Sequence, residues 1–237
     1  MINEYLFNLK YKIANHISGY PGLYTIISKK LTGRDCYTNR HTDIVIDGHP
    51  RSANTYATYA FKTAQTRDVI IANHIHKKSQ FLIAEKYGIP AILLIRNPLD
   101  CISSLLIRQP KYNPVVLFEG YSYLYEGLKY SNSFVVGDFE DIINNYAEII
   151  SRVNKKFGKN FDLYYKTPKN EDIVKHIVHT QDELKGVSDY DQRVAYPNES
   201  RKKVIGDIKS QLLEPKYKSY YDKCQDIYAH FITNKNS

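Results

Sequence analysis

The sequence contains few of the residues that build covalently or metal-stabilised folds. It has three cysteines in 237 residues, one methionine and no tryptophan. The cysteines, Cys36, Cys101 and Cys224, are odd in number and none belongs to a Cys-x-x-Cys pair. This pattern argues against a disulfide framework and against a cysteine-rich zinc site. We therefore expect a protein of a reducing compartment that is stabilised by its hydrophobic core.

Long apolar runs are absent as well. No window approaches the roughly 18 apolar residues of a membrane-spanning helix. The first twenty residues carry charges where a signal peptide needs a continuous apolar stretch. The sequence therefore predicts a soluble, cytoplasmic protein without a membrane span.

Charge of one sign is in excess. Lys and Arg number 33 against 25 Asp and Glu, which gives a net charge of +8 and a pI of about 9.1. Such a balance favours an anionic partner, namely nucleic acid, membrane headgroups, a nucleotide or an acidic glycan, and charge alone does not choose among them. Helix-turn-helix and RNA-binding signatures are not visible, so we predict no nucleic acid partner.

Short β-branched runs alternate with helical segments along the chain. Strands are expected at 43–48, 68–73, 90–96 and 132–138. Helices are expected at 2–31, with a Gly/Pro break at 19–22, and at 53–66, 77–88, 97–109 and 140–158. This alternation predicts a three-layer α/β domain with a central parallel sheet. We expect one domain over 1–237: an N-terminal helical segment (1–41), a core (42–210) and a C-terminal helix (211–237), with the C-terminal part mostly helical.

One expected strand runs into a loop of the kind that binds phosphate. The stretch from Gly48 to Thr55, G-H-P-R-S-A-N-T, has the frame of the G-x-x-x-x-G-K-[ST] loop between a strand and a helix. Backbone N–H groups at the start of that helix can cradle an anion. Asn54 replaces the lysine that contacts a triphosphate, and Arg51 places a cation inside the loop. This P-loop-like element favours a phosphate-bearing ligand other than ATP with magnesium.

Two further motifs are expected near this loop, because ligands of open parallel sheets bind beyond the carboxyl ends of the strands. Arg96 ends the third strand, and Ser104 lies about two turns into the next helix. The two side chains can grip one phosphate from two sides. The alternative is an ion pair between Arg96 and Asp100. The basic cluster at 201–203 is either a solvated helix face or a group that closes over a phosphate.

These motifs resemble those of the sulfotransferases that use 3′-phosphoadenosine 5′-phosphosulfate (PAPS). That family's 5′-phosphosulfate loop resembles P-[KR]-S-G-[TN]-T, and this chain has P-R-S-A-N-T at 50–55. Its 3′-phosphate motif resembles R-N-P-x-D-x-x-x-S, which is present at 96–104. Its C-terminal motif resembles R-K-G-x-x-G-D, and this chain has R-K-K-V-I-G-D at 201–207. The resemblance covers most of the chain, from about residue 42 to residue 210.

The resemblance implies in-line transfer of a sulfuryl group from PAPS to a hydroxyl or amine, with 3′-phosphoadenosine 5′-phosphate (PAP) as product and no metal. It implies His74 as the general base, with His76 as its rival, and Arg51 and Ser104 as further catalytic residues. A small-molecule or glycan acceptor is expected, with a carbohydrate or glycolipid hydroxyl favoured by the breadth of the family. The residues implied to hold the sulfonucleotide are Arg51, Ser52, Ala53, Asn54, Thr55, Arg96, Ser104, Phe139, Arg201, Lys202 and Lys203.

Several positions depart from the family's pattern. Ala53 stands for the usual glycine, so that backbone must tolerate a Cβ. Ala72 stands where many relatives have lysine, with Lys77 or Lys78 as substitutes. Lys203 replaces the glycine of the third motif, and a phenylalanine stands near the adenine where soluble relatives often have tyrosine.

Two other classes of function stay open at the level of sequence. A P-loop kinase would require the missing lysine and Mg²⁺, whereas a non-catalytic module would bind a nucleotide or an acidic polymer through its basic surface. The tyrosine-rich stretch 109–127 is expected to help form the acceptor side of the site. The sequence makes no prediction about the oligomeric state.

Overall fold

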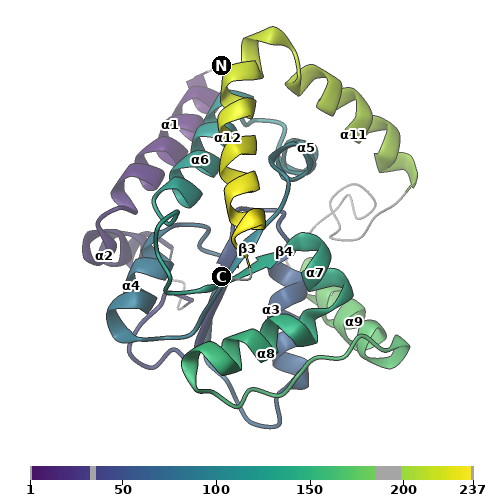
Figure 1. The fold of residues 1–237 in the computed structure, drawn as a ribbon. Helices are drawn as coiled ribbons and strands as arrows, with labels where there is room; N and C mark the ends of the chain where they lie inside the picture. Colours follow the sequence, from purple (N-terminus) through teal and green to yellow (C-terminus); the bar gives the residue numbers. More distant parts are fainter. Residues whose placement is uncertain (1, 33–35, 185–198, 236–237) are drawn as a thin grey trace.

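Four short strands form one parallel sheet in the computed structural model, which describes residues 2–32, 36–184 and 199–235 (Figure 1). The strands are β1 (Ile44–Gly48), β2 (Ile71–Asn73), β3 (Ala91–Ile95) and β4 (Val135–Asp138), in the order β2-β1-β3-β4. β1 lies at the centre, since Ile46 is in register with Asn73 on one side and with Ile92 on the other. The parallel sheet confirms the predicted α/β class.

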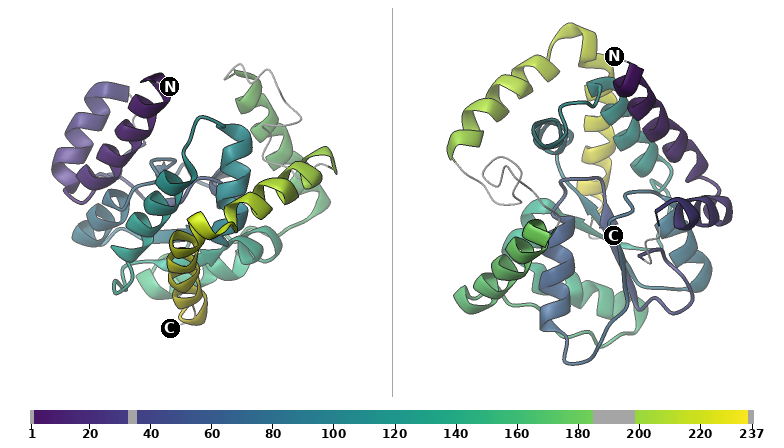
Figure 2. Two further views of the ribbon diagram at one scale, coloured as in Figure 1. Left: turned by 90° about the horizontal axis from the view of Figure 1, so that it is seen from above. Right: turned by 180° about the vertical axis from the view of Figure 1, so that it is seen from behind.

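Helices cover both faces of this sheet and give the domain three layers (Figures 1 and 2). One face carries α4 (Ser79–Tyr87), α5 (Pro98–Arg108), α6 (Pro114–Glu126) and α12 (Pro215–Thr233). The other face carries α3 (Asn54–Ala64), α7 (Phe139–Asn144), α8 (Tyr146–Phe157) and α9 (Pro168–Leu184). α11 (Glu199–Leu212) packs on α5, while α1 (Ile2–Ile17) and α2 (Pro21–Thr32) lie side by side at one edge and contact α6 and α4.

The strands supply the core of both layers, because successive side chains point to opposite faces. In β3, Leu93 and Ile95 pack under α5 and α6, whereas Ile92 and Leu94 pack under α3 and α8. All five residues of β3 are buried, as expected for a parallel strand covered on both faces.

The helix signals in the sequence mostly mark true boundaries. Gly88 has a φ of 62° and ends α4, and the Asn97 side chain accepts a hydrogen bond from the Leu99 amide at 3.0 Å to begin α5. The helix expected at 140–158 is instead two helices, α7 and α8, which part at Asn145 with a φ of −146°. Within the described ranges, no helix is both long and apolar enough to cross a membrane.

Gly48 ends β1 at a point where the backbone of β3 leaves no room for a side chain. A Cβ at this position would clash with the carbonyl oxygen and the Cβ of Leu94. The glycine therefore lets the two central strands stay paired up to the start of the phosphate-type loop.

We predict that Gly48→Ala destabilises the protein by about 2 kcal/mol or more, because the new methyl group meets backbone atoms that cannot move independently. Urea unfolding measures the change. Gly206→Ala is the matched control: its Cβ meets no atom within 4 Å in α11, and alanine should stabilise that helix by about 1 kcal/mol. Equal stability of wild type and Gly48→Ala would contradict the close approach of β1 and β3.

Candidate functional site

The loops that follow β1, β2 and β3 meet beyond the carboxyl ends of these strands. Arg51 in the β1 loop donates from Nε to Ser104 Oγ of α5 at 2.9 Å, and Arg96 at the end of β3 donates from Nη1 to the Arg51 carbonyl at 3.1 Å. Thr55, in the first turn of α3, lies 3.1 Å through Oγ1 from His74 Nε2 after β2. Five residues singled out in the sequence are therefore brought together at one edge of the sheet.

The β1 loop delivers the chain into α3 through Ala53, which has a φ of 64° in the left-handed region and makes no side-chain cap. The Asn54 side chain is buried and donates from Nδ2 to the His49 carbonyl at 2.9 Å. Asn54 thus fixes the loop from within and does not extend outward as the lysine of a nucleotide-hydrolysing loop does. Ser52, which belongs to the same loop, is fully buried.

Arg96 and Phe139 form the next part of the site. The guanidinium carbon of Arg96 lies 3.9 Å from the centre of the ring of Phe139, and Phe139 is the first residue of α7, directly after β4. The alternative pairing of Arg96 with Asp100 is not found, since Asp100 pairs with Lys209 of α11. Arg96 is therefore held over an aromatic ring and against the β1 loop.

Hydrogen bonds fix the tautomer of His74. The Asn73 amide donates from Nδ2 to the Ile71 carbonyl at 3.1 Å, which turns its Oδ1 toward His74 Nδ1 at 2.7 Å. Because Asn73 Oδ1 only accepts, His74 donates from Nδ1, and in the neutral imidazole the lone pair on Nε2 then faces the Thr55 hydroxyl. This is the arrangement of a side chain ready to accept a proton.

His76 takes a different position from His74. Its Nδ1 lies 2.7 Å from the Gly48 carbonyl and 3.1 Å from Asp47 Oδ1, so it donates toward the end of β1. The two imidazole rings are 5.8 Å apart at their centres. Of the two, His74 is the histidine that contacts the first turn of α3.

Asp47 joins the β1 and β2 loops. Its side chain is fully buried, and Oδ2 accepts from the amides of Ile75 at 3.0 Å and of His76 at 2.9 Å, while Oδ1 accepts from the Gly48 amide at 2.9 Å. Burial raises the pKa of Asp47, but the charge and hydrogen bonds of His76 outweigh it and hold the pKa below its ordinary value. The sequence analysis missed this residue, although an aspartate inside the apolar run I-V-I-D-G was the available signal.

Backbone strain is concentrated in these two loops. Among the described residues, four that are not glycine have positive φ: Arg51 (72°), Ala53 (64°), His74 (56°) and His76 (57°). All four belong to the loops that Asp47 joins. Such conformations cost about 1–3 kcal/mol each and persist only where surrounding contacts enforce them, which is typical of functional sites.

Two tyrosines of α6 make hydrogen bonds to the backbone around the site. The Tyr125 hydroxyl accepts from the His49 amide at 2.9 Å and donates to the Leu94 carbonyl at 2.7 Å, and Tyr121 donates to the Arg96 carbonyl at 2.9 Å. Both rings are fully buried. The tyrosine-rich stretch expected on the acceptor side therefore uses these two residues as core supports of the loops.

Neither Lys77 nor Lys78, the proposed substitutes for the lysine that relatives have where Ala72 stands, lies with the other site residues. Ala72 is the middle residue of β2 and is buried in the core. Lys77 is buried with Nζ 2.6 Å from Asn15 Oδ1, and burial lowers its pKa to about 8. Lys78 lies over the Tyr123 ring of α6 at 3.8 Å. The two lysines therefore join the β2 loop to the neighbouring helices α1 and α6.

The third motif lies on a helix. Arg201, Lys202 and Lys203 fall in the first two turns of α11, and the structure describes the backbone of these residues but not their side chains. Val204 to Leu212 continue the helix, which the ion pair of Lys209 with Asp100 joins to α5. The backbone thus places the cluster on the helix that packs against α5, the element that carries Ser104.

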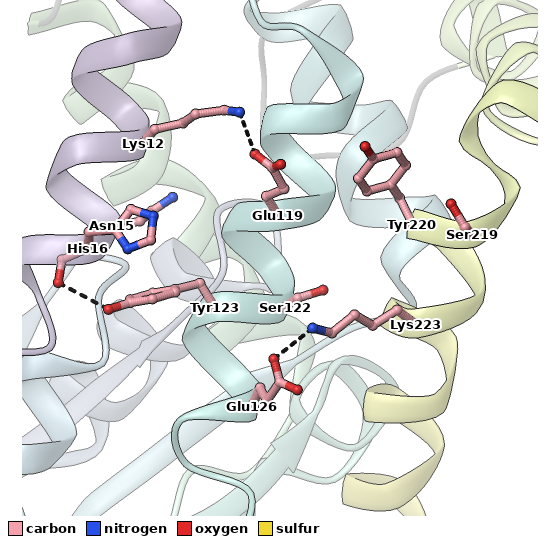
Figure 3. A pocket seen from close by; sticks show the side chains of 10 residues that line it. All are labelled: Lys12, Asn15, His16, Glu119, Ser122, Tyr123, Glu126, Ser219, Tyr220 and Lys223. Atoms are coloured by element: carbon pink, nitrogen blue, oxygen red, sulfur yellow. Dashed lines mark hydrogen bonds and ion pairs between the residues drawn. The ribbon is translucent and has the colours of Figure 1, made fainter.

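A separate groove of about 500 Å³ lies between α1, α6 and α12 (Figure 3). Its charged side chains are paired with one another: Lys12 Nζ lies 2.8 Å from Glu119 Oε2, and Lys223 Nζ lies 2.9 Å from Glu126 Oε2. None of the residues predicted to bind the sulfonucleotide lines this groove.

Comparisons with known proteins add no family to this description. No protein-family model matches the chain, and a search of curated proteins finds no relative.

We predict that Ala53→Gly stabilises the protein by about 0.5–1 kcal/mol, because glycine removes the strain of the left-handed conformation and this outweighs its extra freedom in the unfolded chain. Urea unfolding tests this. The control is Ala57→Gly in the same helix, which should destabilise by about 1 kcal/mol or more. A loss of stability in Ala53→Gly would show that residue 53 is not strained.

His49 should make the protein sensitive to acid. Its ring is buried with no hydrogen-bond partner for Nε2 among the described residues, and burial lowers its pKa from 6.5 to about 3. The unfolded state therefore binds a proton below about pH 6.5 that the folded state refuses until about pH 3.

Over that window His49 should lower the free energy of unfolding by about 1.4 kcal/mol per pH unit as pH falls. Urea unfolding between pH 7 and 4 measures the slope in wild type and in His49→Gln, which lacks the titrating group and should lose this part of the slope. An unchanged slope in His49→Gln would contradict a buried neutral histidine.

Proposed function

We propose that the protein is a PAPS-dependent sulfotransferase. The observation that carries this proposal is the joining of Arg51, Ser104 and Arg96 at the strand ends, beside an uncapped start of α3 and with Arg96 over the Phe139 ring. Two arginines, a hydroxyl and helix amides suit a ligand with two separate phosphate groups. An aromatic ring beside Arg96 suits a nucleobase.

In the proposed reaction the acceptor oxygen attacks sulfur while the bond from sulfur to the bridging phosphate oxygen breaks. The electron pair of that bond stays on the phosphate of PAP, where Arg51 and the loop amides offset the growing charge. The proton of the acceptor hydroxyl passes to His74 Nε2, whose lone pair faces the start of α3. His74 is favoured over His76 because His76 is turned toward Asp47 and Gly48.

The acceptor in this proposal is a small molecule or glycan with a hydroxyl or amine, and a carbohydrate or glycolipid hydroxyl is the first class to test. The proposed mechanism uses no metal, because the charge on the leaving phosphate is offset by arginine and backbone amides. The kinase alternative is disfavoured because position 54 supplies a buried amide in place of a cation.

Calorimetric titration with PAP, AMP and ATP·Mg²⁺ tests the donor site. We expect PAP to bind more tightly than AMP, and Arg96→Ala to weaken PAP binding by tenfold or more through loss of charge-assisted hydrogen bonds. Arg67→Ala is the matched control, since Arg67 pairs with Asp43 on the surface and touches no predicted site residue. Tighter binding of ATP·Mg²⁺ than of PAP would favour the kinase, and binding of neither would favour a non-catalytic module.

Transfer from labelled PAPS to a panel of hydroxyl acceptors then tests the base. His74→Ala should lower kcat by about 10²–10⁴-fold, the usual contribution of a positioned general base. PAP affinity should change little in this variant, which separates catalysis from donor binding. His76→Ala is run in parallel, and a larger loss of kcat there would assign the base to His76.

A further inference from the structure

The exposed apolar side chains of the protein gather near the N-terminus. Seven of the fifteen large apolar residues exposed in the described parts of the chain fall between residues 5 and 26, about a tenth of the sequence. Scattered single residues of this kind are ordinary, whereas apolar side chains that share one exposed face mark an interaction site. We define the N-terminal apolar surface as six of them on α1 and α2: Tyr5, Leu6, Leu9, Ile13, Leu23 and Ile26.

The part of this surface on α1 lies opposite the side that packs on the protein. Leu6, Leu9 and Ile13 follow the three- and four-residue spacing of one helix face. At about 100° per residue, that face points away from Tyr11 and Asn15, which contact the buried Lys77. Leu6, Leu9 and Ile13 are 46%, 37% and 48% exposed. Packing of α1 on the protein requires one apolar face, and these residues form a second one.

The sequence of this segment carries mostly positive charge. Residues 5–32 contain four lysines, at 10, 12, 29 and 30, and no aspartate or glutamate. Helix geometry places Lys10 on one flank of the α1 stripe and Lys12, which pairs with Glu119 of α6, on the other. Glu4, the acidic residue within α1, is also exposed, at the start of the helix and on the side of Tyr11 and Asn15 by the same geometry. An apolar stripe bordered by lysine is the pattern of helices that lie in the interface of a membrane.

We propose that the N-terminal apolar surface binds the surface of an anionic phospholipid bilayer. The apolar side chains would enter the boundary between headgroups and acyl chains, while Lys10 contacts lipid phosphates. Charge favours this partner over a second copy of the chain, because a symmetric dimer through this surface would bring lysines against the same lysines. The proposal is independent of the proposed sulfotransferase activity.

Sedimentation with vesicles tests the proposal on the full chain. We expect the wild type to bind vesicles of phosphatidylcholine and phosphatidylglycerol, to bind pure phosphatidylcholine more weakly, and to lose binding as salt rises. These experiments need neither PAPS nor an acceptor. Failure of the sulfotransferase proposal would therefore leave this result unaffected, and the reverse also holds.

Matched variants connect the binding to this surface. Ile13→Ser should weaken binding to anionic vesicles by about tenfold, whereas Leu213→Ser, at a residue 49% exposed beyond α11, should not. Lys10→Gln should weaken binding by about fivefold, whereas Lys159→Gln, at an exposed lysine after α8, should have no effect. These positions are exposed, so the variants should unfold at the same urea concentration as wild type.

The absence of tryptophan provides a direct reporter. Leu9→Trp makes a chain with a single tryptophan on the proposed surface, and Leu213→Trp makes the control. Anionic vesicles should shift the emission of Leu9→Trp to the blue, and lipids brominated on the acyl chain should quench it, while Leu213→Trp should respond to neither.

Two results would overturn the proposal. The first is no binding of wild type to anionic vesicles at low salt, or equal binding of Ile13→Ser and wild type. The second is a dimer in light scattering that Ile13→Ser converts to monomer, without vesicle binding, which would assign the surface to self-association.

Discussion

The carboxylate of Asp47 is the interaction on which the candidate site depends. It lies at the end of the central strand with no exposure to solvent, and it receives the amides of Gly48, Ile75 and His76 together with the His76 ring. A buried charge is tolerated only when it is paired and hydrogen-bonded, so the surrounding loops must keep their conformation. Because the β2 loop also carries His74, Asp47 fixes the distance between this histidine and the start of α3.

The same constraint explains where the backbone is strained. The positive φ values of Arg51, Ala53, His74 and His76 lie in two loops that are held at many points. Tyr125 accepts a hydrogen bond from the His49 amide of the β1 loop, and Asp47 accepts one from the Gly48 amide just before it. A loop fixed in this way can present amides and a guanidinium to an anion without first becoming ordered, which lowers the entropic cost of binding.

α1 contributes to two parts of the molecule. Its inner face holds Lys77, the residue after His76, through Asn15 and the ring of Tyr11. Its outer face carries the N-terminal apolar surface with its flanking lysines. Packing against the rest of the protein and support of the β2 loop account for the inner face of α1. They do not account for its apolar outer face.

Local signals in the sequence determined the order of strands and helices, the three layers, the phosphate-type loop and the approach of Arg96 to that loop. These features depend on periodicity, caps and the rule that parallel strands end at one edge, all of which act over a few residues. Tertiary structure alone decided the hydrogen-bond partners of Asp47 across the loops, the burial of His49, the support from Tyr125 and the different directions of His74 and His76. Each of these depends on a partner that is close in space but distant in sequence or reached only through a strained turn, and no local pattern specifies such a partner.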